Sequence, residues 1–253
     1  MSYPKDILST RAVVKPGLYA ILPRGGLVNN VLPGVTGAKV SIVASPKLGA
    51  SFVQYVIEAE PGAVAQEPLC GETGVEGFIY CIEGKADCEA GGKKIHLSAG
   101  GYIYVPANQG GIKFSCRESA RLLLYKQKYI PLQGKAPYLV QGNVNEIPFV
   151  EYEGMKNVFI KDLLPKDIAF DMNMHILSFE PGGCHSFVET HVQEHGAYIL
   201  SGEGMYIMEN EWLPIRKDDF MWFGPYVPQG SYGVGREPFA YIYSKDCNRD
   251  VSF

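Results

Sequence analysis

The sequence predicts an all-β protein made of two jelly-roll domains in tandem, each a β-sandwich or barrel. Two observations support this prediction: short runs rich in Val, Ile, Tyr and Phe recur along the chain, and its two halves repeat one another. The 253 residues include 29 glycines and 17 prolines, which separate these runs. Short strands bounded by such turn residues are typical of antiparallel sandwiches and barrels. Closing the sheets into a jelly roll buries one face of each sheet and protects its edges.

The two halves of the chain repeat one another at a nearly constant offset. The run VIEAEPG ends at Gly62 and ILSFEPG ends at Gly182, 120 residues further on. YCIEG ends at Gly84 and YILSG ends at Gly202, 118 residues further on. The same shift of 118 residues carries LLLYK onto AYIYS. A constant offset over so many predicted strands indicates an internal duplication.

The duplication also predicts the domain boundaries. We expect an N-terminal domain over residues 1–135 and a C-terminal domain over residues 150–253. The intervening segment, near 130–155, is rich in turn residues and is expected to be the linker.

The composition excludes several classes of function. The 23 basic and 27 acidic residues leave a net charge of −4, which is too balanced for a nucleic-acid or membrane surface. The chain has no run of about 18 apolar residues, and its start lacks the apolar region of a secretory signal. Its six cysteines form no CxxC pair. We therefore expect a cytoplasmic protein with free thiols that acts on a small molecule.

The densest polar cluster lies in the run PGGCHSFVETHVQEHGAYILSG. Its spacing from Gly183 to Gly202 matches G-x5-H-x-H-x3-E-x6-G, the first signature of the cupin fold. Glu189, His191 and His195 occupy its three polar positions. Glu stands first where most cupins have His, and His stands third where they have Glu. The predicted fold is therefore a tandem cupin, or bicupin.

A second cupin signature, G-x5-P-x-G-x2-H, has its spacing from Asp218 to Gln229, with Gln in the place of His. Residues two apart on a strand point to the same side, so Glu189 and His191 are expected to face the barrel interior. Two imidazoles, a carboxylate and an amide oxygen suit Mn²⁺ or Fe²⁺ better than zinc, and the weak amide ligand favours Mn²⁺. We expect one Mn²⁺ per chain in the C-terminal domain, with four ligands: Glu189, His191, His195 and Gln229.

The N-terminal domain is expected to bind no metal. The offset of 118 residues places the four ligand positions at Gly71, Thr73, Gly77 and Gly111. None of these side chains is a good metal ligand. Two nearby carboxylates, Glu72 and Glu76, are expected to be solvated because no imidazole accompanies them. This domain is therefore expected to support the other domain or an interface.

The polar cluster also admits other interpretations. HVQEH matches the inverted zincin motif H-x-x-E-H, but that motif needs a helix through residues 191–195, and glycines and strand-like residues flank this segment. The histidines could also be ordinary hydrogen-bonded core residues. His185 is expected to have a structural role, although a place beside the metal ligands is the alternative. His96 and His175 have no expected function.

Several long runs resemble the (S)-ureidoglycine aminohydrolases: AFDMNMHILSF, ETHVQEHGAYILSG and YIYSKDCNRDV. The resemblance implies a bicupin that binds Mn²⁺ in its C-terminal domain and forms a homo-oligomer. It also implies release of ammonia from (S)-ureidoglycine to give (S)-ureidoglycolate, a step of allantoin and purine degradation. By position, Glu189, Gln229, Tyr241 and Lys245 would bind the substrate. Glu189 would also be the nearest group for proton transfer.

Two other functions remain open on the sequence alone. One is another bicupin metalloenzyme activity, such as that of an iron-dependent dioxygenase. The other is a non-catalytic bicupin that binds a metabolite, because the fold does not require catalysis.

Overall fold

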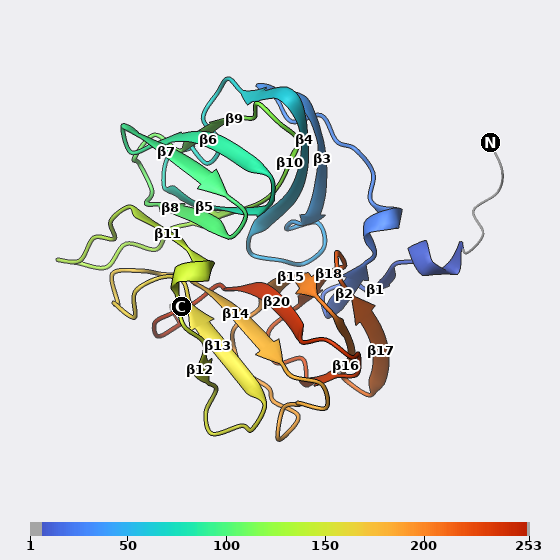
Figure 1. The fold of residues 1–253 in the computed structure, drawn as a ribbon. Coiled ribbons are helices and arrows are strands. Elements are labelled where there is room, and N and C mark those ends of the chain that lie inside the picture. The colour runs from blue at the N-terminus through green and yellow to red at the C-terminus, as the bar shows by residue number, and fades with distance from the viewer. Residues whose placement is uncertain (1–6, 252–253) are drawn as a thin grey trace.

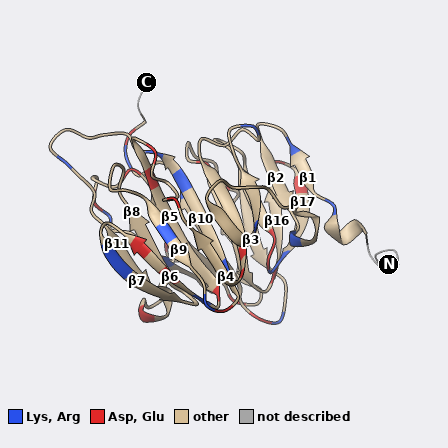
Figure 2. Ribbon diagram, turned by 90° about the horizontal axis from the view of Figure 1, so that it is seen from above, with Lys and Arg blue, Asp and Glu red and all other residues tan. Residues whose placement is uncertain are grey.

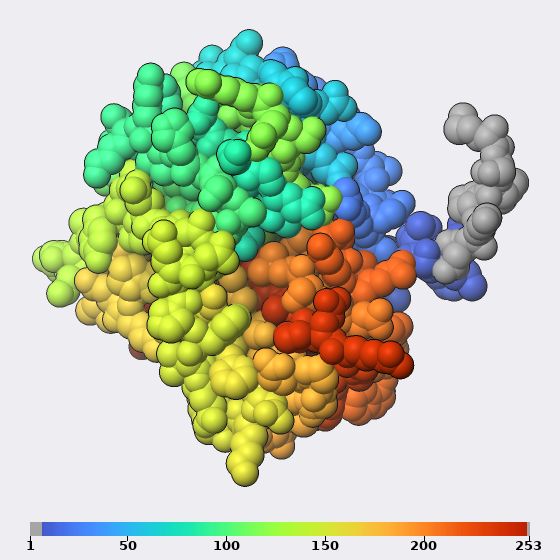
Figure 3. All heavy atoms as spheres, viewed as in Figure 1, coloured from blue at the N-terminus to red at the C-terminus, as the bar shows by residue number. Residues whose placement is uncertain are grey.

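The computed structural model describes residues 7–251, and apart from three short 3₁₀ helices their regular secondary structure is all β-strand. The predicted all-β class is confirmed. Figure 1 shows two lobes, with the first half of the chain forming one and the second half most of the other. Their atoms pack closely together on the face shown in Figure 3. None of the helices within residues 7–251 is long and apolar enough to cross a membrane.

The strands form one sheet in the first lobe and two in the second. The sheet of the first lobe contains β3 (Val35–Ala44), β4 (Val53–Ala65), β5 (Val75–Glu83), β6 (Lys85–Ala90), β7 (Lys93–Ser98), β8 (Gly101–Val105), β9 (Ile112–Ser115), β10 (Ala120–Lys128) and β11 (Val140–Asn143). The larger sheet of the second lobe contains β1 (Val13–Lys15), β2 (Tyr19–Leu22), β12 (Val150–Glu151), β13 (Val158–Asp162), β14 (Asn173–Phe179), β15 (His195–Ser201), β18 (Phe220–Phe223) and β20 (Phe239–Lys245). A small sheet contains β16 (Glu203–Met208), β17 (Glu211–Arg216) and β19 (Gln229–Gly233). Three short 3₁₀ helices complete the fold: η1 (Leu8–Thr10), η2 (Arg24–Gly26) and η3 (Val144–Glu146).

The two lobes exchange strands. β2, near the start of the chain, pairs with β18 of the second lobe, whereas β11 pairs with β8 of the first lobe. β8 and β18 are equivalent strands of the repeat, as are β2 and β11, so the exchange is reciprocal. Each added strand covers an edge that would otherwise present unpaired backbone groups. Chain order alone therefore does not give the sheet that each strand joins: β1 and β2 lie within residues 1–135 and belong to the larger sheet of the second lobe.

Alternation along the central strands separates three apolar cores. On β8, Ile103 and Val105 face the interior of the first lobe, and Tyr104 faces the second lobe. On β20, Ile242 joins the core between the lobes, while Tyr241 faces the interior of the second lobe. The period of two thus gives β20 one face for packing and one face for the interior cavity.

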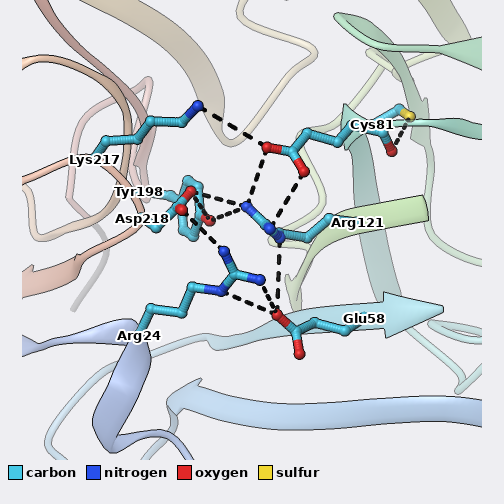
Figure 4. Close-up of polar contacts among 8 residues, drawn as sticks. Arg24, Glu58, Cys81, Arg121, Tyr198, Lys217 and Asp218 are labelled. Carbon is cyan, nitrogen blue, oxygen red and sulfur yellow. Dashed lines mark hydrogen bonds and ion pairs between the residues drawn. The ribbon is translucent and has the colours of Figure 1, made fainter. Parts of the chain in front are cut away.

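A partly buried ionic network also joins the lobes (Figure 4). Arg121 on β10 is 8% exposed and lies 2.9 Å from Oδ1 of Asp218 in the second lobe. Arg24 bridges the two sides, because it contacts Glu58 at 2.7 Å and Asp218 at 3.0 Å. Tyr198 donates to the same Asp218 carboxylate at 2.9 Å. Polar contacts therefore supplement the apolar core at this edge of the interface.

Glu76 differs from the expectation that it is solvated. Its side chain is fully buried beside β8 and β10. Tyr104 contacts one carboxyl oxygen at 2.5 Å, and Nε2 of Gln127 donates to the other at 2.8 Å. Burial raises the pKa of Glu76 to about 7. Glu72 is exposed, as expected, and pairs with Lys126.

Candidate metal centre and substrate pocket

The interior of the second lobe contains a cavity of about 370 Å³. All six residues predicted to bind metal or substrate line it: Glu189, His191, His195, Gln229, Tyr241 and Lys245. Three elements supply four of them: β15 begins at His195, β19 begins at Gln229, and β20 provides Tyr241 and Lys245. The spacing of four residues on β20 places both side chains on the cavity face, as expected.

Glu189 and His191 are not on a regular strand, so that part of the prediction is wrong. Glu189 forms only an isolated bridge with Gln229, and His191 lies in irregular chain. The segment is held by contacts with the loop before β19, because Tyr226 donates its backbone N–H to His191 O at 2.7 Å. Residues 191–195 are not helical, which excludes the inverted zincin interpretation.

The two predicted histidine ligands face each other. Nδ1 of His191 lies 2.9 Å from the carbonyl oxygen of Gln193, and Nδ1 of His195 lies 2.6 Å from that of Ser244. A carbonyl only accepts, so both Nδ1 atoms carry the proton and both Nε2 atoms are bare. The two Nε2 atoms are 3.3 Å apart.

Burial keeps this histidine pair neutral. It lowers the pKa of His191, and it lowers the pKa of His195 well below the ordinary value, with a further contribution from His191. Two lone pairs directed at one another are unfavourable unless a cation lies between them. The arrangement therefore fits a divalent metal, which binds neutral imidazole nitrogen.

Gln229 lies beside the histidine pair. Its Nε2 atom is 3.0 Å from Nε2 of His191, and its Oε1 atom accepts a hydrogen bond from Tyr206 at 2.6 Å. Gln229 is 1% exposed, and so is Tyr206, so both polar contacts are shielded from water. A half-turn of the amide would exchange the oxygen and the nitrogen and present Oε1 to the histidines.

The Glu189 carboxylate lines the same cavity but is turned toward His185. Its Oε1 atom lies 3.7 Å from Nε2 of His185. Burial, with a contribution from Glu153, raises the pKa of Glu189 to about 7. Within residues 7–251, no three His, Cys, Asp or Glu side chains are close enough together to form a metal-binding group. The histidines and the Gln229 amide are therefore the candidate ligands that already lie together, and Glu189 would have to turn toward them to join them.

The first lobe has little room for side chains at two of the equivalent positions. A Cβ atom on Gly77 would lie 2.7 Å from Sγ of Cys70. A Cβ atom on Gly111 would lie 2.3 Å from the carbonyl oxygen of Leu69. Cys70 and Leu69 therefore occupy the space that a metal-binding side chain would need at these positions.

Sequence reasoning missed a polar pair in the wall of the cavity. Nδ1 of His175 on β14 lies 2.8 Å from Oδ1 of Asp162 on β13. This contact lowers the pKa of Asp162 to about 2, whereas burial lowers the pKa of His175. His175 is therefore a neutral donor to an ionised carboxylate. Its signal in the sequence is alternation: Asn173 and His175 are polar at every second position of the apolar run MNMHILSF.

Relatives found by sequence comparison share one name. No family model matches the chain. The protein named (S)-ureidoglycine aminohydrolase from Escherichia coli strain K12 is 49% identical over 251 residues, which cover 98% of this chain and 96% of that protein. The Arabidopsis thaliana protein of the same name is 30% identical over 245 residues, 95% of this chain and 79% of its own length.

Solved structures share the fold. The crystal structure of protein Ylba from E. coli has 45% identity and a TM-score of 0.89, with full coverage of both chains. Oxalate decarboxylase from Lactobacillus farciminis has 15% identity and a TM-score of 0.67, covering 96% of this chain and 89% of its own. The second likeness concerns the fold alone, and it confirms the predicted bicupin architecture. By its identity with full-length relatives, the chain belongs to the (S)-ureidoglycine aminohydrolase family.

Proposed function

We propose that this protein is a Mn²⁺-dependent (S)-ureidoglycine aminohydrolase, which releases ammonia from (S)-ureidoglycine and yields (S)-ureidoglycolate. The observation that supports it most is the pair of bare Nε2 atoms of His191 and His195, 3.3 Å apart in the cavity that also contains Lys245. The E. coli relative, 49% identical, is named for this reaction.

The proposed metal ligands are Glu189, His191, His195 and Gln229. Two neutral imidazoles, one carboxylate and one amide oxygen form a mixed N/O set that suits Mn²⁺. Binding requires the amide half-turn at Gln229 and rotation of the Glu189 carboxylate. A metal ion held there would supply Lewis acidity, which would polarise the substrate and lower the pKa of water.

The residues of the chain would bind and orient the substrate. Lys245 on β20 offers a positive point charge to the substrate carboxylate. Tyr241 is 3% exposed, and burial raises its pKa well above the ordinary value, so its hydroxyl stays protonated and can donate a hydrogen bond. The two side chains lie on the same face of β20 and hold one end of the substrate.

The reaction replaces a C–N bond by a C–O bond. The oxygen of water bonds to the carbon that carries the amine, the C–N bond breaks, and the water proton leaves with ammonia. Glu189 is the carboxyl group proposed to transfer this proton, and burial places its pKa at about 7 in the metal-free protein.

The distribution of charged residues and an exposed edge strand bear on the partners and the assembly of the protein. Basic and acidic residues are interspersed over the strands (Figure 2), which supports a small-molecule substrate rather than nucleic acid or a membrane. We also propose a cytoplasmic homo-oligomer with a metal-free N-terminal domain. The edge strand β12 supports assembly, because Val150 and the adjacent Phe149 are 62% and 46% exposed.

Metal content and ammonia release test the proposal together. Metal-free protein would be loaded with Mn²⁺, analysed for bound metal, and supplied with enzymatically generated (S)-ureidoglycine. We expect about one Mn²⁺ per chain and stereospecific ammonia release. His195→Ala should lose both, whereas His96→Ala, an exposed histidine in the first lobe, should retain both.

Three results would contradict parts of this proposal. Two Mn²⁺ ions per chain would contradict a metal-free first lobe. Full activity of His195→Ala would contradict the assigned centre. Oxygen uptake with Fe²⁺, in place of ammonia release, would support the dioxygenase alternative.

A further inference from the structure

His185 is clamped against β19 by two backbone contacts with one residue. Its backbone N–H donates to the carbonyl oxygen of Ser231 at 3.0 Å. Its ring atom Nδ1 accepts a hydrogen bond from the backbone N–H of Ser231 at 2.9 Å. The residue is 4% exposed, and the ring lies edge-on to Phe179 with the centroids 5.1 Å apart. Neither the position nor the tilt of the ring is free to change.

The backbone contact decides which ring nitrogen of His185 carries the proton. An imidazole always carries at least one N–H, and Nδ1 is occupied as an acceptor. The proton therefore lies on Nε2. This atom is buried and has no hydrogen-bond partner among residues 7–251. A buried N–H without an acceptor is rare and costly.

The Glu189 carboxylate lies near the Nε2–H group. Oε1 of Glu189 is 3.7 Å away, slightly beyond a hydrogen bond. The backbone of Glu189 is fixed by its bridge to Gln229, so only its side chain is free to close the gap. The same side chain would have to turn before Glu189 could join the metal centre.

We propose that His185 is a positioning residue: its Nε2–H donates to one carboxylate oxygen of Glu189 and leaves the other oxygen to face His191 and His195. The structure holds the two groups 3.7 Å apart, and a rotation of the Glu189 side chain would form this hydrogen bond in the metal-free protein. Its consequence, a Glu189 that binds metal through a single oxygen, rests on the proposed function. Such partners of metal ligands orient the ligand, and their loss lowers metal affinity by about 10- to 100-fold.

NMR of metal-free protein with ¹⁵N-labelled histidine tests the hydrogen bond directly. We expect a protonated Nε2 and an unprotonated Nδ1 for His185. In Glu189→Ala, the Hε2 resonance should shift and exchange faster with water, while Nδ1 stays unprotonated. A protonated Nδ1, or an Hε2 resonance unchanged in Glu189→Ala, would overturn the proposal. This test requires no substitution of His185 itself.

A pair of variants tests the consequence for the metal. At position 185, a Gln side chain would place its Nε2–H group near the position of Nε2 in the native histidine. An Asn side chain would place only an acceptor, near the position of Nδ1. We expect His185→Gln to bind Mn²⁺ within about threefold of the wild type and His185→Asn to bind 10- to 100-fold more weakly. Thermal unfolding of both variants measures any general loss of packing.

Failure of the positioning role and failure of the proposed function would give different results. Equal Mn²⁺ affinity for His185→Asn and the wild type, or equal losses in both variants, would overturn the positioning role. A wild-type protein that binds no Mn²⁺ would instead contradict the proposed function, and the NMR experiment would still decide the hydrogen bond.

Discussion

The backbones of Glu189 and Gln229 hydrogen-bond to each other in both directions. Glu189 N–H donates to Gln229 O at 2.9 Å, and Gln229 N–H donates to Glu189 O at 2.9 Å. This bridge joins two proposed ligands from different parts of the chain without using either side chain. The two side chains have different neighbours: Nε2 of His185 lies 3.7 Å from the Glu189 carboxylate, and the Tyr206 hydroxyl donates to the Gln229 amide.

The first prediction concerns the hydroxyl of Tyr206. Tyr206→Phe removes the hydrogen bond of 2.6 Å to Gln229 and leaves a buried amide without that partner. We expect the free energy of unfolding of metal-free protein to fall by about 1–3 kcal/mol. Urea denaturation measures this change.

Tyr232→Phe is the matched control for this prediction. Tyr232 lies on β19, close to Gln229, and its hydroxyl makes no hydrogen bond within residues 7–251. We expect its removal to change stability by less than about 0.5 kcal/mol. Equal effects of the two substitutions would show that the Tyr206 contact has no special role.

The second prediction concerns the charge of Lys245. Lys245→Met keeps an apolar stem of similar length and removes the positive charge. We expect kcat/KM for (S)-ureidoglycine to fall roughly 10- to 100-fold, mostly through a higher KM, because a charged contact to the carboxylate is lost. Steady-state ammonia release measures this, and bound Mn²⁺ should be unchanged.

Lys166 provides the comparison for Lys245. It also lines the cavity, but its side chain is 78% exposed and it pairs with Asp162 at 2.9 Å. Lys166→Met should therefore change kcat/KM little. A normal KM for Lys245→Met, or loss of its metal, would contradict a role in carboxylate binding.

The sequence predicted the fold class well because both of its signals are local or periodic. Turn residues marked the strands, and the constant offset revealed the duplication. The exchange of β2 and β11 between lobes was not predicted, since the offset relates equivalent positions and does not say which copy of a sheet each strand joins. Edge pairing decides that, and it depends on contacts far apart in the sequence.

The sequence predicted which residues share the candidate site, but not all of their partners. Motif spacing identified four polar residues that share the cavity, although Glu189 and His191 lie off any regular strand. The contact between His175 and Asp162 was missed because it depends on the register of β13 against β14. Glu76 was expected to be solvated, yet Tyr104 and Gln127 enclose it. Sequence spacing does not reveal partners that come from neighbouring strands.

The third prediction concerns the buried Glu76. Burial raises its pKa from 4.5 to about 7. Because the folded state holds this proton more tightly, the stabilising contribution is full below about pH 4.5 and is lost as the pH rises to about 7. Glu76→Gln mimics the neutral carboxyl, so it should unfold like the wild type at pH 4.5. At pH 8 we expect it to be more stable by about 1–3 kcal/mol.

Denaturant unfolding of both proteins at the two pH values measures this difference. Glu118→Gln, at a side chain that is 54% exposed, should show no comparable dependence on pH. A stability difference between Glu76→Gln and the wild type that is the same at pH 4.5 and pH 8 would contradict the raised pKa.

The fourth prediction concerns the ionic network between the lobes (Figure 4). Arg121 has a side chain that is only 9% exposed and lies 2.9 Å from Asp218. Arg121→Met leaves a largely buried carboxylate with fewer partners, and breaking such pairs costs about 3–5 kcal/mol. Because Arg24 still contacts Asp218 at 3.0 Å, we expect the free energy of unfolding to fall by about 3 kcal/mol.

Lys217→Ala is the control for this prediction. It removes a contact of 4.0 Å with Glu83 between side chains that are 55% and 50% exposed, so its effect should stay below about 1 kcal/mol. Urea denaturation distinguishes the two variants, and a loss for Arg121→Met no larger than that for Lys217→Ala would show that the Arg121 contacts contribute no more than an exposed ion pair.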